Sequence, residues 1–365
     1  MKKIIALTLA AVMASAPVCA MADSFEREIA SYPWARESAE YCFNNGILSG
    51  DEFGNFDLGG NLTRAQMARI FTDAFGLERA ADTQFDDFKA SDWYADYSLA
   101  LQNYMPKKDA DFKGGEYVTR EEFAATLVAV SGGKPSRDTS VTVFNFGDAA
   151  EVDDAYKNWV ETAVLDRYLL GDGGNVLPKN LLTRAEACAF LYRALEPSAD
   201  KTLITGKPEV TLEQAVSWAK SKNAADIYLE VAPIYWYYGE QFGIRPDVMF
   251  AQAAKETAYG KYTGTVKPEM NNWAGIKIQN PTPEKLIENF ESFKTPDDGV
   301  RGHFNHMSAY VGVPPIGEVH GRYNVVKSLD WAGTVRYVEE LGGRWCPEIN
   351  YGADLVKWIE EMKQF

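Results

Sequence analysis

The chain has 365 residues, 46% of them hydrophobic, which is enough to build two or three domains with buried cores. Its 52 acidic and 37 basic residues give a formal net charge of −15. This composition excludes a wholly disordered chain, and the acidic balance excludes a protein that binds nucleic acid by neutralising phosphates, so we expect no nucleic-acid partner.

The first segment has the organisation of a secretory signal peptide. Two lysines precede an apolar run over residues 4–16, and the small residues Ala20 and Ala22 follow. The apolar run is shorter than the roughly 20 residues of a membrane span, which disfavours the alternative of a retained anchor. Cys19 lacks the small residue that normally precedes a lipidated cysteine. We therefore predict a signal peptide over residues 1–22, an exported protein, and no membrane span after its cleavage.

Three cysteines remain after cleavage, namely Cys42, Cys188 and Cys346. Their wide separation is typical of neither a disulfide framework nor a metal-ligand cluster. Cys42 and Cys188 lie in apolar helical patterns, where a cysteine usually serves as a small buried hydrophobe. A Cys42–Cys188 disulfide remains an open alternative.

A short motif then occurs three times. Each copy places a threonine before an apolar helix, with Gln or Glu three residues later, which is the pattern of a helix capping box. An amphipathic helix containing a tryptophan and a loop, rich in glycine in the first and third copies, precede each motif. The motifs are Thr63-Arg64-Ala65-Gln66, Thr119-Arg120-Glu121-Glu122 and Thr183-Arg184-Ala185-Glu186. One such unit cannot bury its apolar face alone, so we predict three repeats packed on one another, over residues 25–80, 81–133 and 140–196.

These repeats resemble the S-layer homology (SLH) domain. Besides the three capped helices, the resemblance is carried by Asn45-Gly46-Ile47-Leu48-Ser49-Gly50, by Phe85-Asp86-Asp87 with Trp93, and by Leu169-Leu170-Gly171-Asp172. It implies a three-repeat helical prism with a pseudo-threefold axis. It also implies a non-covalent partner in the cell wall, either a secondary wall polymer or modified peptidoglycan. The second copy replaces the Gly-Ile turn with Tyr104-Met105-Pro106, so the grooves between copies need not be equivalent.

Two sets of side chains are candidates for contact with that polymer. Arginine can bind an acidic group in a bidentate manner, and tryptophan offers an apolar face. The alternatives are that each arginine caps a neighbouring helix and that each tryptophan is core, which we favour for the tryptophans. The candidates are Trp34, Arg64, Trp93, Arg120, Trp159 and Arg184.

Residues 197–210 lack apolar periodicity and are predicted to be a linker. A helical domain is predicted over residues 211–365. In the helix that starts at Pro246, Met249, Ala253 and Glu256 share one face, so a carboxylate ends an otherwise apolar stripe. Burial would raise the pKa of this carboxyl and keep it protonated, as protonation of a glycosidic oxygen requires. The alternative is a solvated glutamate, or one paired with Lys255 or Lys261.

The surrounding motifs resemble the glucosaminidase family of peptidoglycan hydrolases (glycoside hydrolase family 73-like). They are Ala251–Gly260, Asn271-Asn272-Trp273-Ala274-Gly275-Ile276-Lys277, Asp298–Met307, Leu341-Gly342-Gly343-Arg344-Trp345 and Tyr351-Gly352. The resemblance implies a lysozyme-like, mainly α domain with a small β-hairpin or loop lobe. It implies that Glu256 is the catalytic acid and that Tyr351 assists it. The residues expected to shape the site or contact sugar are Asn272, Gly275, Lys277, Tyr310 and Trp345. For Tyr310 and Trp345, packing in the core is an equally open alternative to stacking on a sugar ring.

The second catalytic group is not determined by the sequence. A two-carboxylate mechanism needs a partner for Glu256, whereas a substrate-assisted route, using the N-acetyl oxygen of the sugar, needs none. The acidic candidates that we cannot rank are Glu269, Glu288, Glu291, Asp297 and Asp298. His303 and His306 share a helix face, but no further ligand follows at a characteristic spacing, so we expect no metal and no cofactor.

The sequence thus predicts a mainly α, exported protein of the cell wall or cell surface. Its function is predicted to be that of an endo-β-N-acetylglucosaminidase that cleaves peptidoglycan glycan strands while the repeats hold it to the wall. One alternative is a non-catalytic structural or adhesive protein whose hydrolase-like domain only grips glycan. Another is an amidase, which is disfavoured because no set of histidine and acidic metal ligands is apparent.

Overall fold

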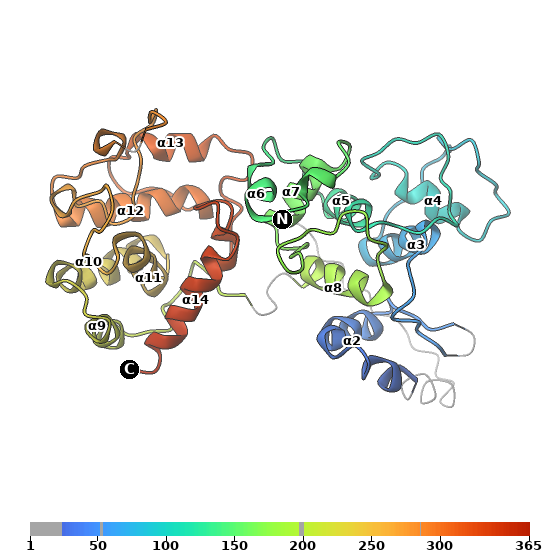
Figure 1. Cartoon of the computed structure of the whole chain (residues 1–365), viewed down its shortest axis with the longest axis horizontal. Helices are drawn as coiled ribbons and strands as arrows, with labels where there is room; N and C mark the ends of the chain where they lie inside the picture. Colours follow the sequence, from blue (N-terminus) through green and yellow to red (C-terminus); the bar gives the residue numbers. More distant parts are fainter. Residues whose placement is uncertain (1–23, 52–53, 197–200, 285) are drawn as a thin grey trace. The chain divides into compact units, whose positions relative to one another are not determined.

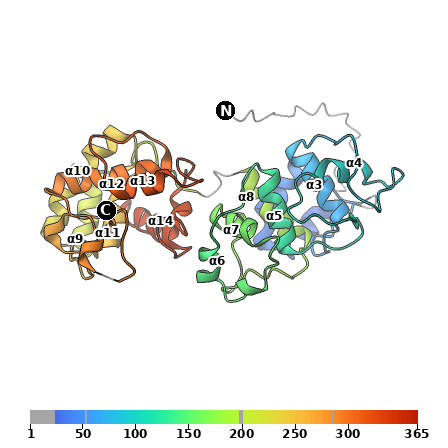
Figure 2. The same ribbon diagram turned by 90° about the horizontal axis from the view of Figure 1, so that it is seen from above.

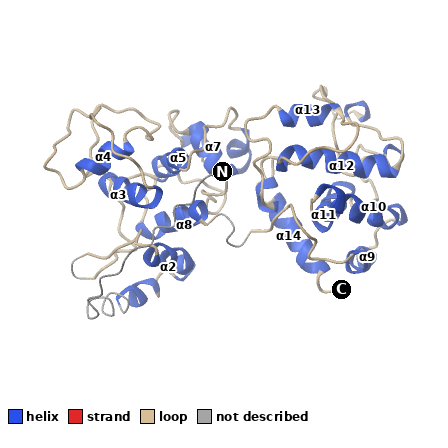
Figure 3. Cartoon of the chain, turned by 180° about the vertical axis from the view of Figure 1, so that it is seen from behind, coloured by secondary structure: helices blue, strands red, loops and turns tan. Residues whose placement is uncertain are grey.

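The computed structural model describes residues 24–51, 54–196, 201–284 and 286–365 (Figure 1). The chain divides into two compact units, Met1–Pro197 and Ser198–Phe365. Helices and loops account for nearly all of the described residues, which form isolated backbone bridges but no sheet (Figure 3). The predicted mainly α class is therefore confirmed. The predicted signal peptide, 1–22, and Cys19 lie outside the described residues. Within the described ranges, no helix is both long enough and apolar enough to span a bilayer.

The first unit contains three pairs of helices and one additional short helix. Residues 24–29 are also helical, and short 3-10 turns cover Pro33–Ala35 and Ala149–Glu151. The helices are α2 (Arg36–Asn44), α3 (Arg64–Phe75), α4 (Ala95–Leu101), α5 (Arg120–Val130), α6 (Ser140–Asn145), α7 (Lys157–Leu165) and α8 (Arg184–Leu195).

Threonine begins the second helix of each repeat, as the motif predicts. The hydroxyls of Thr63, Thr119 and Thr183 each accept a hydrogen bond from the backbone N–H three residues later. In the first and third copies the side-chain oxygens of Gln66 and Glu186 accept a hydrogen bond from the threonine N–H, which completes the capping box. These caps fix where α3, α5 and α8 begin.

The three copies close into a ring through their backbones. Leu62 N–H donates to Leu182 O at 2.8 Å, Leu182 N–H donates to Val118 O at 2.9 Å, and Val118 N–H donates to Leu62 O at 2.9 Å. All three side chains are fully buried. This cyclic set of bonds, one from each copy, gives the first unit its pseudo-threefold centre.

The helices pack with the same cyclic order. The first helix of each pair lies against the second helix of another pair, in the combinations α4 with α3, α7 with α5, and α2 with α8. The inner helices α3, α5 and α8 gather in the middle of the unit (Figures 1 and 2). There the Phe71 and Phe123 rings lie 4.8 Å apart and the Phe123 and Phe190 rings 5.8 Å apart. The arrangement is a three-repeat helical prism.

Cys42 on α2 and Cys188 on α8 meet in this core. The Cys42 thiol lies 3.9 Å from the carbonyl oxygen of Cys188, and both residues are buried as free thiols. The open alternative of a Cys42–Cys188 disulfide is therefore not realised in this structure.

The second unit is built around one central helix. Helix α11 packs against α10 and α14, and α12 packs against α10 and α13 (Figure 1). Short 3-10 turns occur at Pro268–Met270, Ile287–Asn289 and Val338–Leu341. The helices are α9 (Leu212–Ser221), α10 (Asp226–Phe242), α11 (Pro246–Thr257), α12 (Pro296–Val311), α13 (Gly321–Lys327) and α14 (Tyr351–Met362).

The small lobe of this unit is a loop closed by a few ladder bonds. Lys277 and Phe290 form an antiparallel bridge, flanked by bonds from Ile278 N–H to Asn289 O at 2.9 Å and from Glu291 N–H to Ile276 O at 2.8 Å. The predicted hairpin lobe is thus present only in part, because the described residues of this loop form one antiparallel bridge and no β-strand.

The linker prediction for residues 197–210 is wrong for the described part of that segment. Ile204 and Val210 are buried in the core of the second unit. Ile204 N–H donates to Arg336 O at 3.0 Å, and its carbonyl accepts from Arg245 N–H at 2.8 Å. The large apolar residues of this part, Leu203, Ile204 and Val210, give no periodicity, although Ile204 is anchored on residues distant in the sequence.

Candidate functional site

Helix α11 carries the predicted acid at its C-terminal end. Pro246 occupies its first turn, and residues 246–254 are all buried, so the helix is surrounded by the second unit. Met249 and Ala253 are fully buried, whereas Glu256 is half-buried. The predicted face, apolar until it ends in a carboxylate at the edge of the core, is confirmed.

The chain leaves α11 through a strained turn. Four non-glycine residues between positions 258 and 271 adopt left-handed backbone conformations, namely Ala258 (φ 51°), Tyr259 (φ 59°), Tyr262 (φ 48°) and Asn271 (φ 50°). Such conformations cost about 1–3 kcal/mol each and cluster at functional sites when the surroundings hold them in place. Here the Thr257 hydroxyl binds the turn by accepting from Gly260 N–H at 2.9 Å.

Two donors converge on one oxygen of the Glu256 carboxyl. Trp345 Nε1–H donates to Oε1 at 3.0 Å, and the Tyr351 hydroxyl donates to the same atom at 2.5 Å. Burial raises the pKa of the Glu256 carboxyl above its usual value, and these two hydrogen bonds partly oppose that rise. Lys255 pairs with Asp354 at 2.7 Å instead, so the alternative of a Glu256–Lys255 ion pair is wrong.

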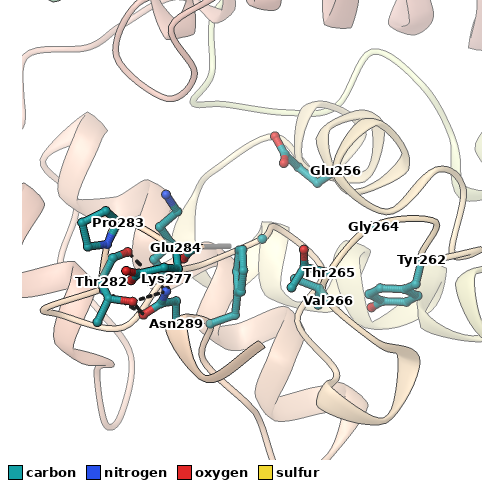
Figure 4. A pocket seen from close by; sticks show the side chains of 12 residues that line it. Glu256, Tyr262, Gly264, Thr265, Val266, Lys277, Thr282, Pro283, Glu284 and Asn289 are labelled. Atoms are coloured by element: carbon teal, nitrogen blue, oxygen red, sulfur yellow. Dashed lines mark hydrogen bonds between the residues drawn. The ribbon is translucent and has the colours of Figure 1, made fainter. Parts of the chain in front are cut away.

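The other oxygen faces a cavity. Among the described residues no hydrogen-bond donor contacts Glu256 Oε2, and a Cβ added to Gly275 would lie 3.5 Å from it. Glu256 and Gly275 both line a cavity of about 400 Å³. Figure 4 shows Glu256 among the lining side chains. That volume suits a small number of sugar-sized groups. The other lining residues are Tyr262, Gly264, Thr265, Val266, Lys277, Thr282, Pro283, Glu284, Asn289 and Phe290.

A second carboxylate lines this cavity, and the sequence analysis did not name it. Glu284 lies with Lys277, Thr282 and Pro283 on the loop side of the cavity, and Glu256 stands apart from them on α11 (Figure 4). The pKa of Glu284 is lowered by hydrogen bonds from its own backbone and from Thr282. The two carboxyls that share the cavity therefore have pKa values displaced in opposite directions.

None of the five acidic residues named from the sequence lines the cavity. Asp297 accepts a hydrogen bond from the Tyr238 hydroxyl at 2.8 Å, and Asp298 pairs with Arg301 at 2.9 Å. Glu269 and Glu288 are exposed, and Glu291 lies half-buried beside the ladder of the small lobe. Exposed Glu284 gave no sequence signal except its place in the loop after Lys277.

The predicted sugar-contacting residues divide into two groups. Gly275 and Lys277 line the cavity. Asn272 is fully buried and its amide binds the backbone of Ile276 and Glu291 at 2.8–2.9 Å, so it shapes the loop and does not itself line the cavity. The reason is that a buried amide must satisfy its own donors and acceptor.

Tyr310 and Trp345 pack against each other near Glu256, and neither belongs to the cavity lining. Tyr310 is buried, and its ring packs 5.3 Å from that of Trp345. Neither side chain lines the cavity, so the expected stacking on sugar is not seen. Trp345 acts instead through its bond to Glu256, and Tyr310 supports Trp345.

The histidines serve packing and hydrogen bonding. His303 and His306 are buried on α12, and His320 caps α13. Burial lowers the pKa of His303 to about 3, so its ring is neutral. Within the part of the chain that the structure describes, no three His, Cys, Asp or Glu side chains are grouped closely enough to hold a metal ion.

Two of the three repeat arginines join neighbouring copies. Arg64 Nε donates to Glu122 at 2.6 Å, and Arg120 Nη1 donates to Glu186 at 2.8 Å. In each pair the acid belongs to the capping motif of the next copy. Both arginines are buried, so their guanidinium groups are already engaged within the prism rather than presented to a polymer.

Arg184 differs from Arg64 and Arg120, whose partners are glutamates in the capping motif of the next copy. After the third copy the next one in the ring is the first, and the equivalent residue there is Gln66. The Gln66 carbonyl already accepts from Thr63 N–H at 2.9 Å. Arg184 donates to the backbone carbonyls of Phe56 at 2.8 Å and Ser49 at 3.1 Å, and no carboxylate among the described residues forms an ion pair with it. One of the three equivalent positions therefore has a cation without an acidic side-chain partner.

The tryptophans are not core, contrary to the alternative favoured for them. Trp34 is 61% exposed and Trp93 59% exposed, whereas Trp159 is half-buried. The amphipathic pattern assigned all three residues to helices, but Trp34 lies in the 3-10 turn before α2 and Trp93 in the turn before α4. Trp159 alone lies within a helix, α7.

Comparison with known families agrees with this geometry. Residues 232–364 match the glucosaminidase family, described as mannosyl-glycoprotein endo-beta-N-acetylglucosaminidase, and residues 29–68 match the S-layer homology domain. The chain contains an S-layer homology domain followed by a glucosaminidase domain. The matched glucosaminidase segment includes Glu256, Trp345, Tyr351 and the cavity. The assignment of the second and third repeats to this family stays a prediction, in line with the cyclic backbone geometry of the first unit.

Curated relatives share about half of this chain. The surface-layer 125 kDa protein of Lysinibacillus sphaericus is 31% identical over 50% of the chain and 17% of its own length. Exoglucanase XynX of Acetivibrio thermocellus is 27% identical over 45% of the chain and 16% of its own length. The S-layer protein sap of Bacillus anthracis is 25% identical over 59% of the chain and 28% of its own length. The chain thus spans less than a third of each of these relatives.

Proposed function

We propose that this protein is an exported, wall-bound peptidoglycan hydrolase that acts as an endo-β-N-acetylglucosaminidase, with Glu256 as its proton donor. The observation that supports this most strongly is the asymmetry of the Glu256 carboxyl. Oε1 accepts two hydrogen bonds, and Oε2 faces a cavity of about 400 Å³. A proton on this carboxyl therefore resides on Oε2, where a glycosidic oxygen can take it.

The proposed step is general acid catalysis. Glu256 Oε2–H gives its proton to the glycosidic oxygen as the bond from that oxygen to the anomeric carbon breaks, and the positive charge develops on the sugar ring. The raised pKa favours the protonated form of Glu256, while the lowered pKa of Glu284 favours the ionised form of that carboxyl. We propose that Glu284 stabilises the developing positive charge, as expected of paired carboxyls with opposite shifts.

We further propose that the first unit binds an acidic wall polymer through the surface around Arg184. Its guanidinium lacks a carboxylate partner, in contrast to Arg64 and Arg120. Exposed Trp34 and Trp93 offer apolar faces of the kind that sugar rings bind. The S-layer names of several relatives support a location at the cell surface. Attachment there would raise the local concentration of glycan substrate.

Zymography on gels that contain peptidoglycan tests the proposal. Glu256→Gln keeps an oxygen that accepts from Trp345 and Tyr351 but removes the transferable proton, so we expect the clearing band of the wild type to disappear. Glu288→Gln, at an exposed acid of the small lobe outside the cavity, is the matched control and should clear as the wild type does. Equal clearing by Glu256→Gln, or none by the wild type, would favour the non-catalytic alternative, a glycan-gripping adhesive or structural protein.

A further inference from the structure

A continuous chain of hydrogen bonds extends from Glu256 into the core of the glucosaminidase domain. Beyond Tyr351, whose hydroxyl binds Glu256, the Gln252 amide nitrogen lies 3.1 Å from the Tyr351 oxygen. The Gln252 carbonyl lies 2.9 Å from His303 Nε2, and His303 Nδ1 lies 3.0 Å from the Tyr235 hydroxyl. Tyr351, Gln252, His303 and Tyr235 are all at least 98% buried.

The two ends of the chain determine the direction of every bond. Tyr351 has one hydroxyl proton, and donating it to Glu256 obliges its oxygen to accept from Gln252. The Gln252 amide nitrogen then faces Tyr351, so its carbonyl must accept from His303 Nε2–H. Because the His303 ring is neutral, it has one proton, and Nδ1 is left to accept from the Tyr235 hydroxyl. Each donor in the chain thus points toward Glu256.

We propose that Gln252, His303 and Tyr235 are positioning residues that orient the Tyr351 hydroxyl toward Glu256 Oε1. With that hydroxyl fixed as a donor, Oε1 remains an acceptor whether or not the carboxyl is protonated, and the acidic proton is confined to Oε2 in the cavity. This inference rests on the proposed function of Glu256, but it concerns residues that do not touch the cavity.

The burial of these groups favours a directed network over a merely polar core. Buried hydroxyl, amide and imidazole groups cost free energy unless each is paired, and apolar side chains of the same shape would avoid that cost. They come from four helices, α10, α11, α12 and α14, which must meet with the right geometry at Gln252. A fully satisfied network of this kind holds its members in a single arrangement.

The charged groups around Glu256 do not take over the role of the network, which is to orient the Tyr351 hydroxyl toward Oε1. Lys255 on its own helix pairs with Asp354, and Glu348 opposes ionisation of Glu256 from the loop before α14. None of the other titratable groups around the carboxyl, in the loop before α14, on α12 or across the cavity, donates a hydrogen bond to it. These are Cys346, Tyr310, Tyr262, Lys277 and Glu284.

The sharpest variant is Tyr235→Phe, which removes one oxygen four side chains away from Glu256. Without that donor, His303 loses the contact that keeps its proton on Nε2, and the chain can reverse so that Tyr351 donates to Gln252. We expect the pKa of Glu256 to rise, the high-pH limb of kcat to move upward, and kcat to fall several-fold with little change in KM. Tyr228→Phe is the matched control, because Tyr228 is an equally buried residue of α10 whose hydroxyl binds only Phe250 O at 2.6 Å.

Two spectroscopic readouts on the full chain keep this test separate from activity. The chain has three histidines, so ¹⁵N spectra of the imidazoles can assign the His303 tautomer, which we expect to be protonated on Nε2. A ¹³C-carboxyl titration of Glu256 should show an upward shift in Tyr235→Phe and none in Tyr228→Phe. The double variant Tyr235→Phe/Tyr351→Phe should shift no further than Tyr351→Phe alone.

A His303 proton on Nδ1, equal shifts in both tyrosine variants, or additive shifts in the double variant would overturn the positioning role. An inactive wild type with the expected tautomer and shifts would sink the proposed hydrolase function and leave the network intact.

Discussion

Tyr351, the first residue of α14, donates a 2.5 Å hydrogen bond to Glu256 in the last turn of α11. Lys255 reinforces the same helix contact, since its ammonium lies over the Tyr351 ring at 5.4 Å and pairs with Asp354. The contact between these two helix ends thus supplies one of the hydrogen bonds that oppose the rise in the pKa of Glu256 caused by burial. Any change that separates the helix ends alters this control of the carboxyl.

Removal of the Tyr351 hydroxyl tests this control directly. Because a donor stabilises the ionised carboxylate, Tyr351→Phe should raise the pKa of Glu256 further and move the high-pH limb of the kcat profile upward. Turnover should fall by about a hundredfold, the lower end of the range for one lost positioned donor. Trp345→Phe removes the other donor and should move the limb in the same direction. A limb that moves downward in either variant would contradict the assigned donors.

The same carboxyl should make stability depend on pH. Burial raises the pKa of Glu256 in the folded protein, so the folded state binds the proton more tightly than the unfolded state. Stability conferred by this group is therefore present at acid pH and lost as pH rises through the raised pKa. Glu256→Gln avoids that loss, so its Tm should exceed that of the wild type at neutral pH and equal it at acid pH. A lower Tm at neutral pH would refute this.

A substitution at Gly275 tests whether hydrolysis needs open space next to Glu256 Oε2. Gly275→Ala places a methyl group 3.5 Å from Glu256 Oε2 and strains a backbone with φ of 59°. Gly243→Ala strains a similar backbone, with φ of 65°, but meets no atom within 4 Å. Both should cost about 1–2 kcal/mol in the free energy of unfolding, and only Gly275→Ala should lower glycan hydrolysis. Equal activity losses would show that strain, not access to Oε2, is responsible.

Substitutions of the equivalent arginines in the three-repeat prism should affect the free energy of unfolding and the binding to cell walls differently. Arg64→Ala leaves Glu122 buried without its partner, so the free energy of unfolding should fall by about 3–5 kcal/mol. Arg184→Ala removes no ion pair, so its cost should be smaller, but sedimentation with purified walls should show weaker binding. Trp34→Ala should likewise weaken wall binding with little change in Tm, since its side chain is 61% exposed. Wall binding unchanged in both would contradict the proposed surface.

Local patterns in the sequence predicted much of this structure. Thr63, Thr119 and Thr183 cap helices because a capping box involves only neighbouring residues. The position of Glu256 at the end of an apolar stripe follows from helical periodicity alone. These features depend on contacts within about one helical turn, which the sequence records directly.

Contacts between distant residues could not be predicted in this way. The partner of Arg64 is Glu122, which lies 58 residues later in another copy, and nothing in either motif identifies the pair. Glu284 is an exposed acid among many in the sequence, and only the folded loop brings it to the cavity of Glu256. Ile204 looked like part of a linker because its partners, Arg245 and Arg336, come from other parts of the domain.

The central claim is that Glu256 donates a proton to a glycosidic bond, and the sugar ends released from peptidoglycan test it most directly. After borohydride reduction, mass spectrometry should detect new N-acetylglucosaminitol ends with the wild type and none above background with Glu256→Gln. An amidase would release stem peptides without new sugar ends. Ends formed at the same rate by both proteins, or no new sugar ends with the wild type, would contradict the account.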